Sequence, residues 1–232
     1  MEVSFGSLNF ESKISKIYSL STIFIINSII QWCLLVNFET FKFLINPWLI
    51  FGAYLTFLLI IIIILVFDCM DKILPAGVEW IFTILLVEIL VIVLSVIVDH
   101  VDPIVLYVSL AIILISMVMI GFLGAKINVD HLPIFVLIVF SANVLLIILI
   151  LVLIFIAKFL KKFYTITFFV VATCVYPILI MNTLYVSLLI HYDRYEIKKL
   201  TDCLKPSLYI YGIFGTYLWF SLNMAIEIGE IL

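Results

Sequence analysis

The sequence predicts an all-α membrane protein, a polytopic bundle of about seven transmembrane helices that forms a single domain over residues 1–232. Two observations support this prediction. The chain is 67% hydrophobic and 12% charged, whereas soluble domains carry roughly 25% charged residues. Its apolar residues also fall into runs of about 20, the length that a helix needs to cross hydrocarbon about 30 Å thick. A soluble core of this size could not bury so much apolar surface, so the lipid bilayer is the expected partner.

Each apolar run is bounded by polar residues or proline. No small-residue cleavage site follows the first run, which therefore predicts a retained helix rather than a signal peptide. Asn46-Pro47 opens the second, because proline suits the first turn of a helix. The only sizeable polar loop extends from about His191 to Pro206. The predicted spans are Ile17–Phe38, Pro47–Phe67, Gly77–Val98, Pro103–Leu123, Leu132–Phe159, Phe163–Ile190 and Leu208–Ile228.

Strands are a poorer interpretation of these runs. The runs are too long for single strands, and they lack the strict alternation of a membrane β-barrel. A helix also satisfies every backbone polar group internally, as lipid requires.

The distribution of basic residues predicts that the N-terminus is cytoplasmic. That orientation leaves four lysines on the other side, namely Lys42, Lys158, Lys161 and Lys162. The cytoplasmic side then holds the larger set of Lys13, Lys16, Lys72, Lys126, Arg194, Lys198, Lys199 and Lys205. The endoplasmic reticulum, the Golgi apparatus and the plasma membrane all remain open as compartments.

Several function classes are not expected. Twelve basic against 15 acidic residues provide no basic patch for nucleic acid. No catalytic Ser/His/Asp set, phosphate loop or His-rich metal motif is visible, so we expect neither an enzyme nor a cofactor. The cysteines have no paired spacing that would indicate a metal site or a disulfide framework. They are Cys33, Cys69, Cys174 and Cys203.

Glu88 is a candidate for an ion pathway or gate. It lies eleven residues beyond Gly77, about 16 Å along a helix and close to the bilayer midplane. An ionisable group at that depth is costly and suggests a function. The alternative is a neutral carboxyl hydrogen-bonded to a neighbouring helix. Glu79 falls on the opposite face of the same helix, near the interface, where a carboxylate needs no special role.

A second candidate group lies in the sixth predicted span. Asn182 and Asp193 share one helix face within about 20°, and both follow Pro177, which predicts a kink. Such a face could line an ion path. Ordinary helix-terminal polarity and interhelical hydrogen bonding are the simpler interpretation, and these residues alone favour it. Arg194, the only arginine, is a candidate ion-pair partner for Asp193.

Other polar residues within the spans are predicted to join helices. Asn27, Ser28 and Gln31 cluster on one face of the first span. Asn143 and Asn223 lie within the fifth and the seventh. Interhelical hydrogen bonding is the expected role of all five.

A series of short motifs resembles one known family. In that family the motifs occur in a fixed order along the chain. Arg-Lys-Val-Tyr starts the first helix, an Asn-Pro loop precedes the second, and the third is led by proline and contains a Glu. Tyr-Asp ends the sixth helix, and Leu-Tyr-Leu-Asp lies in the last. The corresponding residues are Ser15–Leu20, Phe43–Trp48, Pro75 with Glu88, Tyr192-Asp193 and Tyr217-Leu218. The chain thus resembles, distantly and over nearly its whole length, the Lifeguard branch of the Bax-inhibitor family of seven-helix membrane proteins.

The resemblance implies a regulator of intracellular calcium and cell death, acting as a weak cation leak with calcium ions as a partner. In that family a pair of aspartates is thought to sense pH. The second of them corresponds to Trp219, which cannot ionise, and Arg194-Tyr195 replaces the Thr-Gln after the first. Two alternatives therefore remain: a non-conducting protein of the same fold that binds other membrane proteins, and a seven-helix receptor of another family.

Overall fold

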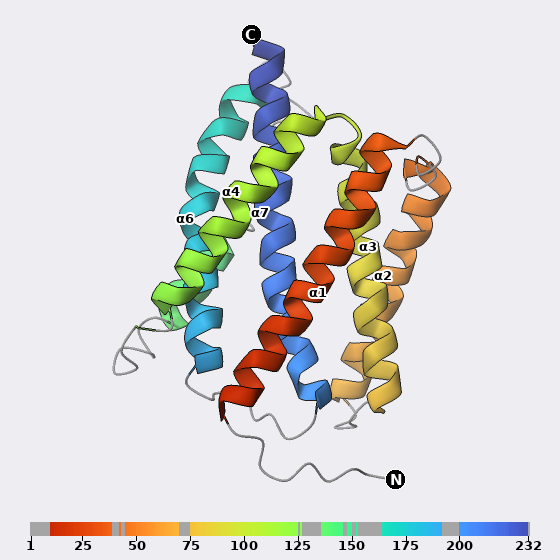
Figure 1. Ribbon diagram of the computed structural model, residues 1–232, viewed down its shortest axis with the longest axis vertical. Helices are drawn as coiled ribbons and strands as arrows, with labels where there is room; N and C mark the ends of the chain where they lie inside the picture. The colour runs from red at the N-terminus through yellow and green to blue at the C-terminus, as the bar shows by residue number, and fades with distance from the viewer. Residues whose placement is uncertain are drawn as a thin grey trace. The chain divides into compact units, whose positions relative to one another are not determined.

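The fold is described by a computed structural model over residues 10–38, 42, 45–69, 75–124, 126, 136–145, 148–149, 152, 164–191 and 200–231. All regular secondary structure in these residues is helical, which confirms the predicted all-α class. The elements in chain order are α1 (Phe10–Asn37), α2 (Pro47–Cys69), α3 (Ala76–Val98), α4 (Pro103–Gly124), α6 (Tyr164–His191), the 3₁₀ helix η4 (Leu200–Cys203) and α7 (Leu204–Ile231). They are drawn in Figure 1. A shorter apolar helix, Val136–Leu145, lies within the fifth predicted span.

The helix starts follow from local chemistry. α2 begins at Pro47, as predicted, and the Asn46 side chain caps it: Oδ1 accepts the backbone N–H of Trp48 at 2.9 Å. α1 begins at Phe10, seven residues before the predicted span. Hydropathy locates the part of a helix that lies in lipid, whereas the mostly polar segment from Glu11 to Lys16 extends the same helix beyond the apolar run.

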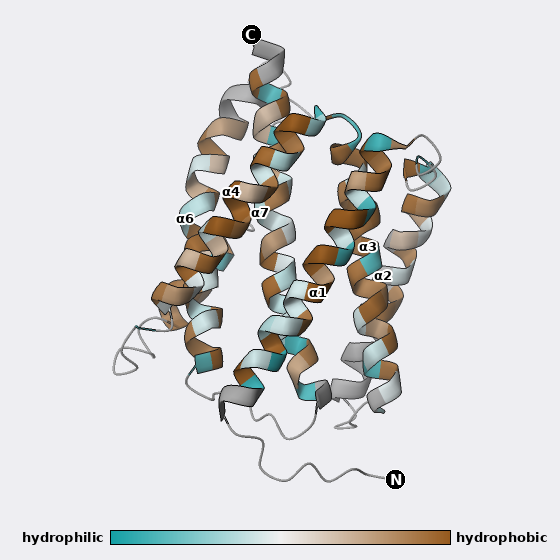
Figure 2. Ribbon diagram, in the orientation of Figure 1, coloured by the Kyte–Doolittle hydropathy of each residue, from teal (hydrophilic) through white to brown (hydrophobic). Residues whose placement is uncertain are grey.

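The protein is an integral membrane protein. Four helical stretches in the described residues are long and apolar enough to cross a bilayer: Lys13–Asn37, Gly77–Val98, Pro103–Gly124 and Phe168–His191. Figure 2 shows that apolar residues follow these helices along most of their length. On α4 the side chains of Ile104, Val118 and Phe122 are 63–72% exposed. Such an exterior suits lipid and would be unfavourable in water.

The chain forms two compact units. Unit 1 consists of Met1–Pro103 and Tyr195–Gly215, and unit 2 of Ile104–Arg194 and Thr216–Leu232. Helix α7 contributes its first half to unit 1 and the remainder to unit 2.

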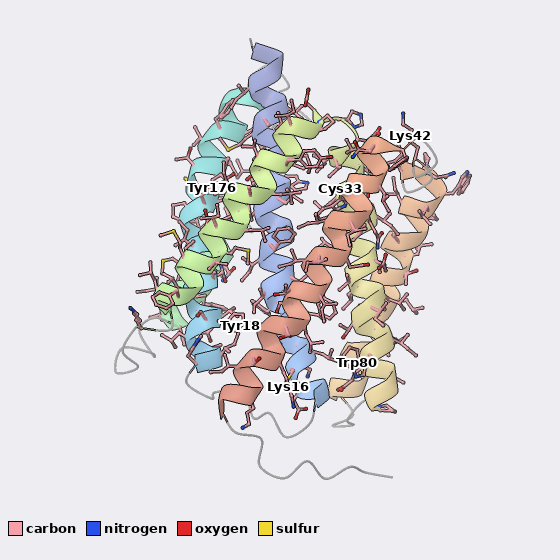
Figure 3. The ribbon with its side chains drawn as sticks, viewed as in Figure 1. Lys16, Tyr18, Cys33, Lys42, Trp80 and Tyr176 are labelled. Carbon is pink, nitrogen blue, oxygen red and sulfur yellow. The ribbon has the colours of Figure 1, made fainter. Side chains whose placement is uncertain are left out.

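In unit 1, α3 packs against both α1 and α2. Helices α1 and α7 run in the same direction. The Ser207 hydroxyl of α7 donates a hydrogen bond to the Ile17 carbonyl of α1, and further along both helices Trp32 stacks on Phe214. Figure 3 shows Lys16 and Trp80 at one end of the unit and Lys42 at the other. These are residue types common at membrane interfaces.

In unit 2, α6 packs against α4 and the second half of α7. Phe168 of α6 stacks on Phe220 at 6.4 Å between ring centroids, and Tyr176 hydrogen-bonds Ser221 at 2.8 Å. Helix α6 approaches α4 closely where the Ser187 hydroxyl donates to the Gly121 carbonyl. Pro177 lies inside α6, at the position where a kink was predicted.

Candidate functional site

Glu88 of α3 is hydrogen-bonded by two amide side chains of α1. Asn27 Nδ2 donates to Glu88 Oε1 at 3.0 Å. Gln31 Nε2 donates to Oε1 at 3.2 Å and to Oε2 at 3.0 Å. Asn27 and Gln31 are one helical turn apart, which brings both amides to the same carboxylate. We call these three residues the carboxylate–amide cluster.

The cluster lies on an exposed seam between α1 and α3. Asn27 is exposed, and Gln31 and Glu88 are half-buried. On α1, Ile23 and Ile30 flank Asn27 at 59% and 53% exposure. On α3, Glu88 continues the helical stripe of exposed residues that includes Ile81 and Ile84. The cluster is therefore a polar patch with exposed isoleucines beside it on both helices.

Behind the seam, α1 and α3 make buried contacts with the first half of α7, which belongs to the same unit. The hydroxyls of Ser28 and Tyr211 are 2.6 Å apart, and Tyr211 also lies within hydrogen-bond distance (3.2 Å) of the Val87 carbonyl. Trp32 Nε1 donates to the Val91 carbonyl at 3.2 Å. The side chains of Ser28, Trp32 and Tyr211 are all buried. These contacts hold α1 and α3 in the register that brings the amides to Glu88.

The chemistry available to the cluster is that of a carboxylate acceptor. Its partners within the described part of the chain are neutral amides rather than cations. A carboxylate has about four acceptor positions. Among the described residues Oε2 accepts a single hydrogen bond, so a further donor can bind there. No group of three or more His, Cys, Asp or Glu side chains that could hold a metal ion occurs among the described residues.

Asn182 lies in unit 2 and pairs with Asn143. Asn143 Nδ2 donates to Asn182 Oδ1 at 2.9 Å, and Asn182 Nδ2 returns the bond at 3.2 Å. Each amide also donates to a carbonyl of its own helix. The pair joins α6 to the Val136–Leu145 helix, which is the interhelical role predicted for Asn143. It satisfies both amides, so the predicted ion-pathway role of Asn182 gains no support from its contacts.

Two of the predicted site residues, Asp193 and Arg194, lie outside the described residues. Glu88 and Asn182 belong to different units, each with its own partners. Trp219, in the position of the second family aspartate, lies on α7 with its ring 4.6 Å edge-on from Phe220.

The chain matches no protein-family model, no curated protein and no solved structure. What the protein does must therefore be inferred from its own residues.

The pairing of Asn27 and Gln31 with Glu88 was not predicted. The sequence places the amides together on one face of the first span, but a match between two helices depends on their relative height. The available signal was the depth of each residue: Asn27 is ten residues into the first predicted span and Glu88 eleven into the third. Parallel spans of similar length place such residues at the same level in the bilayer.

Proposed function

We propose that the protein is a membrane-embedded regulator that acts by binding other membrane proteins through its outer helix faces, without conducting ions or catalysing a reaction. One observation carries this proposal: the carboxylate–amide cluster opens on an exposed seam. Its only described partners are amides within unit 1.

The physical reason is the cost of polar groups in lipid. A carboxylate near the middle of a span costs about 2.5–3.5 kcal/mol to insert. Hydrogen bonds from Asn27 and Gln31 offset part of that cost. The exposed Asn27 amide, and an acceptor position of Glu88 Oε2 that no described residue occupies, can bind a polar group from another helix. Interhelical hydrogen bonds contribute about 0.6–1.7 kcal/mol in membranes.

The process regulated is proposed from the resemblance to the Lifeguard branch, namely intracellular calcium and cell death. Trp219 in place of the second aspartate favours a member of this kind that has lost the acid pair and acts through partners.

The proposal predicts that Glu88 matters for regulation in cells but that the protein carries no calcium flux. Calcium-loaded vesicles that contain the purified protein should release calcium at the same rate as calcium-loaded vesicles without protein. In cells, Glu88→Gln should abolish the change in stored calcium that expression of the wild type produces. Glu79→Gln, on the opposite face of α3, is the matched control and should behave as wild type. Calcium efflux well above that of the protein-free vesicles would refute the proposal.

A weak cation leak is the second candidate, and one observation favours it. Glu88 is an acceptor-rich oxygen site eleven residues beyond Gly77, the start of the third predicted span. Carboxylate and amide oxygens are ligands that calcium accepts. The same vesicle experiment separates the two candidates. A leak predicts efflux from the wild type that falls with Glu88→Gln or Asp193→Asn, whereas the interaction proposal predicts no efflux from any of the three.

A further inference from the structure

We infer that the seam between α1 and α3 docks a transmembrane helix that carries a lysine or arginine near the middle of its span. This inference rests on the proposed function and names the chemistry of the partner. The cluster of Asn27, Gln31 and Glu88 would bind the cation, and the exposed isoleucines beside it would pack against the apolar faces of the same helix.

Charge complementarity identifies the partner. Three N–H contacts reach the two oxygens of Glu88, so the side chain is arranged as an acceptor, and none of these donors carries a positive charge. A lone carboxylate and a lone ammonium are each costly in lipid. Pairing them removes most of that cost from both partners at once. An acceptor position on Oε2 that no described residue occupies would receive the new N–H donor without displacing Gln31.

The shape of the seam fits a helix rather than a small ion. Exposed apolar side chains lie beside the cluster at helical spacing, on α1 from Ile23 to Ile30 and on α3 in the two turns before Glu88, from Ile81 to Leu85. They extend over about two turns of α1. A hydrated ion would leave these side chains in lipid, whereas a third helix would pack along them and cover the polar patch.

A second copy of this chain fits the seam less well. Symmetric dimers bring identical patches together, so two Glu88 carboxylates would face each other across the interface. Like charges at that distance repel, which disfavours the symmetric arrangement. A basic partner has no such penalty.

The inference can be tested with a synthetic single-span helix of leucine and alanine. One version carries lysine at its centre, a second leucine and a third glutamate. Each is labelled for energy transfer and mixed with the full-length protein in vesicles of uncharged phosphatidylcholine. The lysine helix should bind the wild type about tenfold more tightly than the leucine helix, the size expected for one strong interhelical polar contact. The glutamate helix should bind no better than the leucine helix.

Two variants and one control complete the experiment. Glu88→Gln keeps the size of the side chain and should remove the preference for lysine, while Glu79→Gln should retain it. Asn27→Leu changes an exposed position without a buried contact, so folding should survive and the preference should fall. Retention of helical circular dichroism verifies each variant.

Equal binding of the lysine and leucine helices to the wild type would overturn the inference, as would an unchanged preference in Glu88→Gln. Self-association that competes with the lysine helix would instead assign the seam to a second copy. If the synthetic helix fails but Glu88→Gln still abolishes calcium regulation in cells, the proposed function stands and only the basic partner is wrong. If neither depends on Glu88, both proposals fail.

Discussion

Gly124, the last residue of α4, lies so close to α6 that a methyl group would not fit there. A Cβ at this position would be 2.8 Å from Ser187 Cβ, 2.9 Å from the Leu184 carbonyl oxygen and 3.1 Å from Ser187 Oγ. Ordinary contacts of this kind are about 3.5–4.0 Å. Gly124→Ala would therefore push the two helices apart by up to about 1 Å. The nearby hydrogen bond from Ser187 to the Gly121 carbonyl would be lost with that movement.

The expected cost follows from these contacts. Overpacking of this kind costs about 1–3 kcal/mol, and an interhelical hydrogen bond in a membrane contributes about 0.6 kcal/mol. Gly124→Ala should lower the free energy of unfolding by about 2–3 kcal/mol. Gly121→Ala is the matched control, because a Cβ there meets no atom within 4 Å. It should change the free energy of unfolding by less than about 0.5 kcal/mol.

The assay is unfolding by titration from mild detergent into sodium dodecyl sulfate, followed by circular dichroism. Ser187→Gly in the Gly124→Ala background removes two of the three short contacts but leaves the Leu184 carbonyl, so it should restore part of the lost stability. Equal stability of Gly124→Ala and Gly121→Ala would refute the reasoning, because it would mean that α4 and α6 are not in close contact at this point.

Three further predictions concern single residues. Asn143→Leu should cost about 1 kcal/mol because it leaves the Asn182 amide without its partner, and the double replacement with Asn182→Leu should cost less than the sum of the singles in the same titration. Tyr211→Phe removes a buried hydroxyl and leaves Ser28 with one partner fewer, which should lower the free energy of unfolding by about 1 kcal/mol and would be contradicted by an unchanged midpoint. Burial raises the pKa of the Cys203 thiol above its ordinary value of 9.0, with Lys16 and Lys13 opposing the shift and Asp202 adding to it. Above pH 9 the thiol therefore ionises in the unfolded chain before it does so in the folded protein, so stability should fall as pH rises. Cys203→Ala should not show this loss of stability above pH 9. Identical dependence of the free energy of unfolding on pH in the two proteins would contradict the prediction.

The polar residues of the first span show how far the sequence predicts the site. Asn27, Ser28 and Gln31 share a face at helical spacing, which correctly predicts that they join helices. Their partners could not be predicted, because Asn27 and Gln31 bond Glu88 of α3 whereas Ser28 bonds Tyr211 of α7. That division depends on the angle between α1 and its two neighbours, and nothing in the local sequence encodes it. For the same reason the sequence alone supports a functional and a structural interpretation of Glu88 equally.

The lipid environment, the helical class and the approximate positions of the described apolar spans were determined by the sequence alone. The reason is that lipid admits a span only if about 20 consecutive residues are apolar and every backbone group is bonded within the segment. Tertiary structure alone decided which polar side chains meet. Lipid selects against unpaired polar groups but not between alternative partners, so packing chose the pairing of Asn143 with Asn182 and of the α1 amides with Glu88. It also decided that the Glu88 cluster opens on an exposed seam, which is the feature that gives the protein its proposed role.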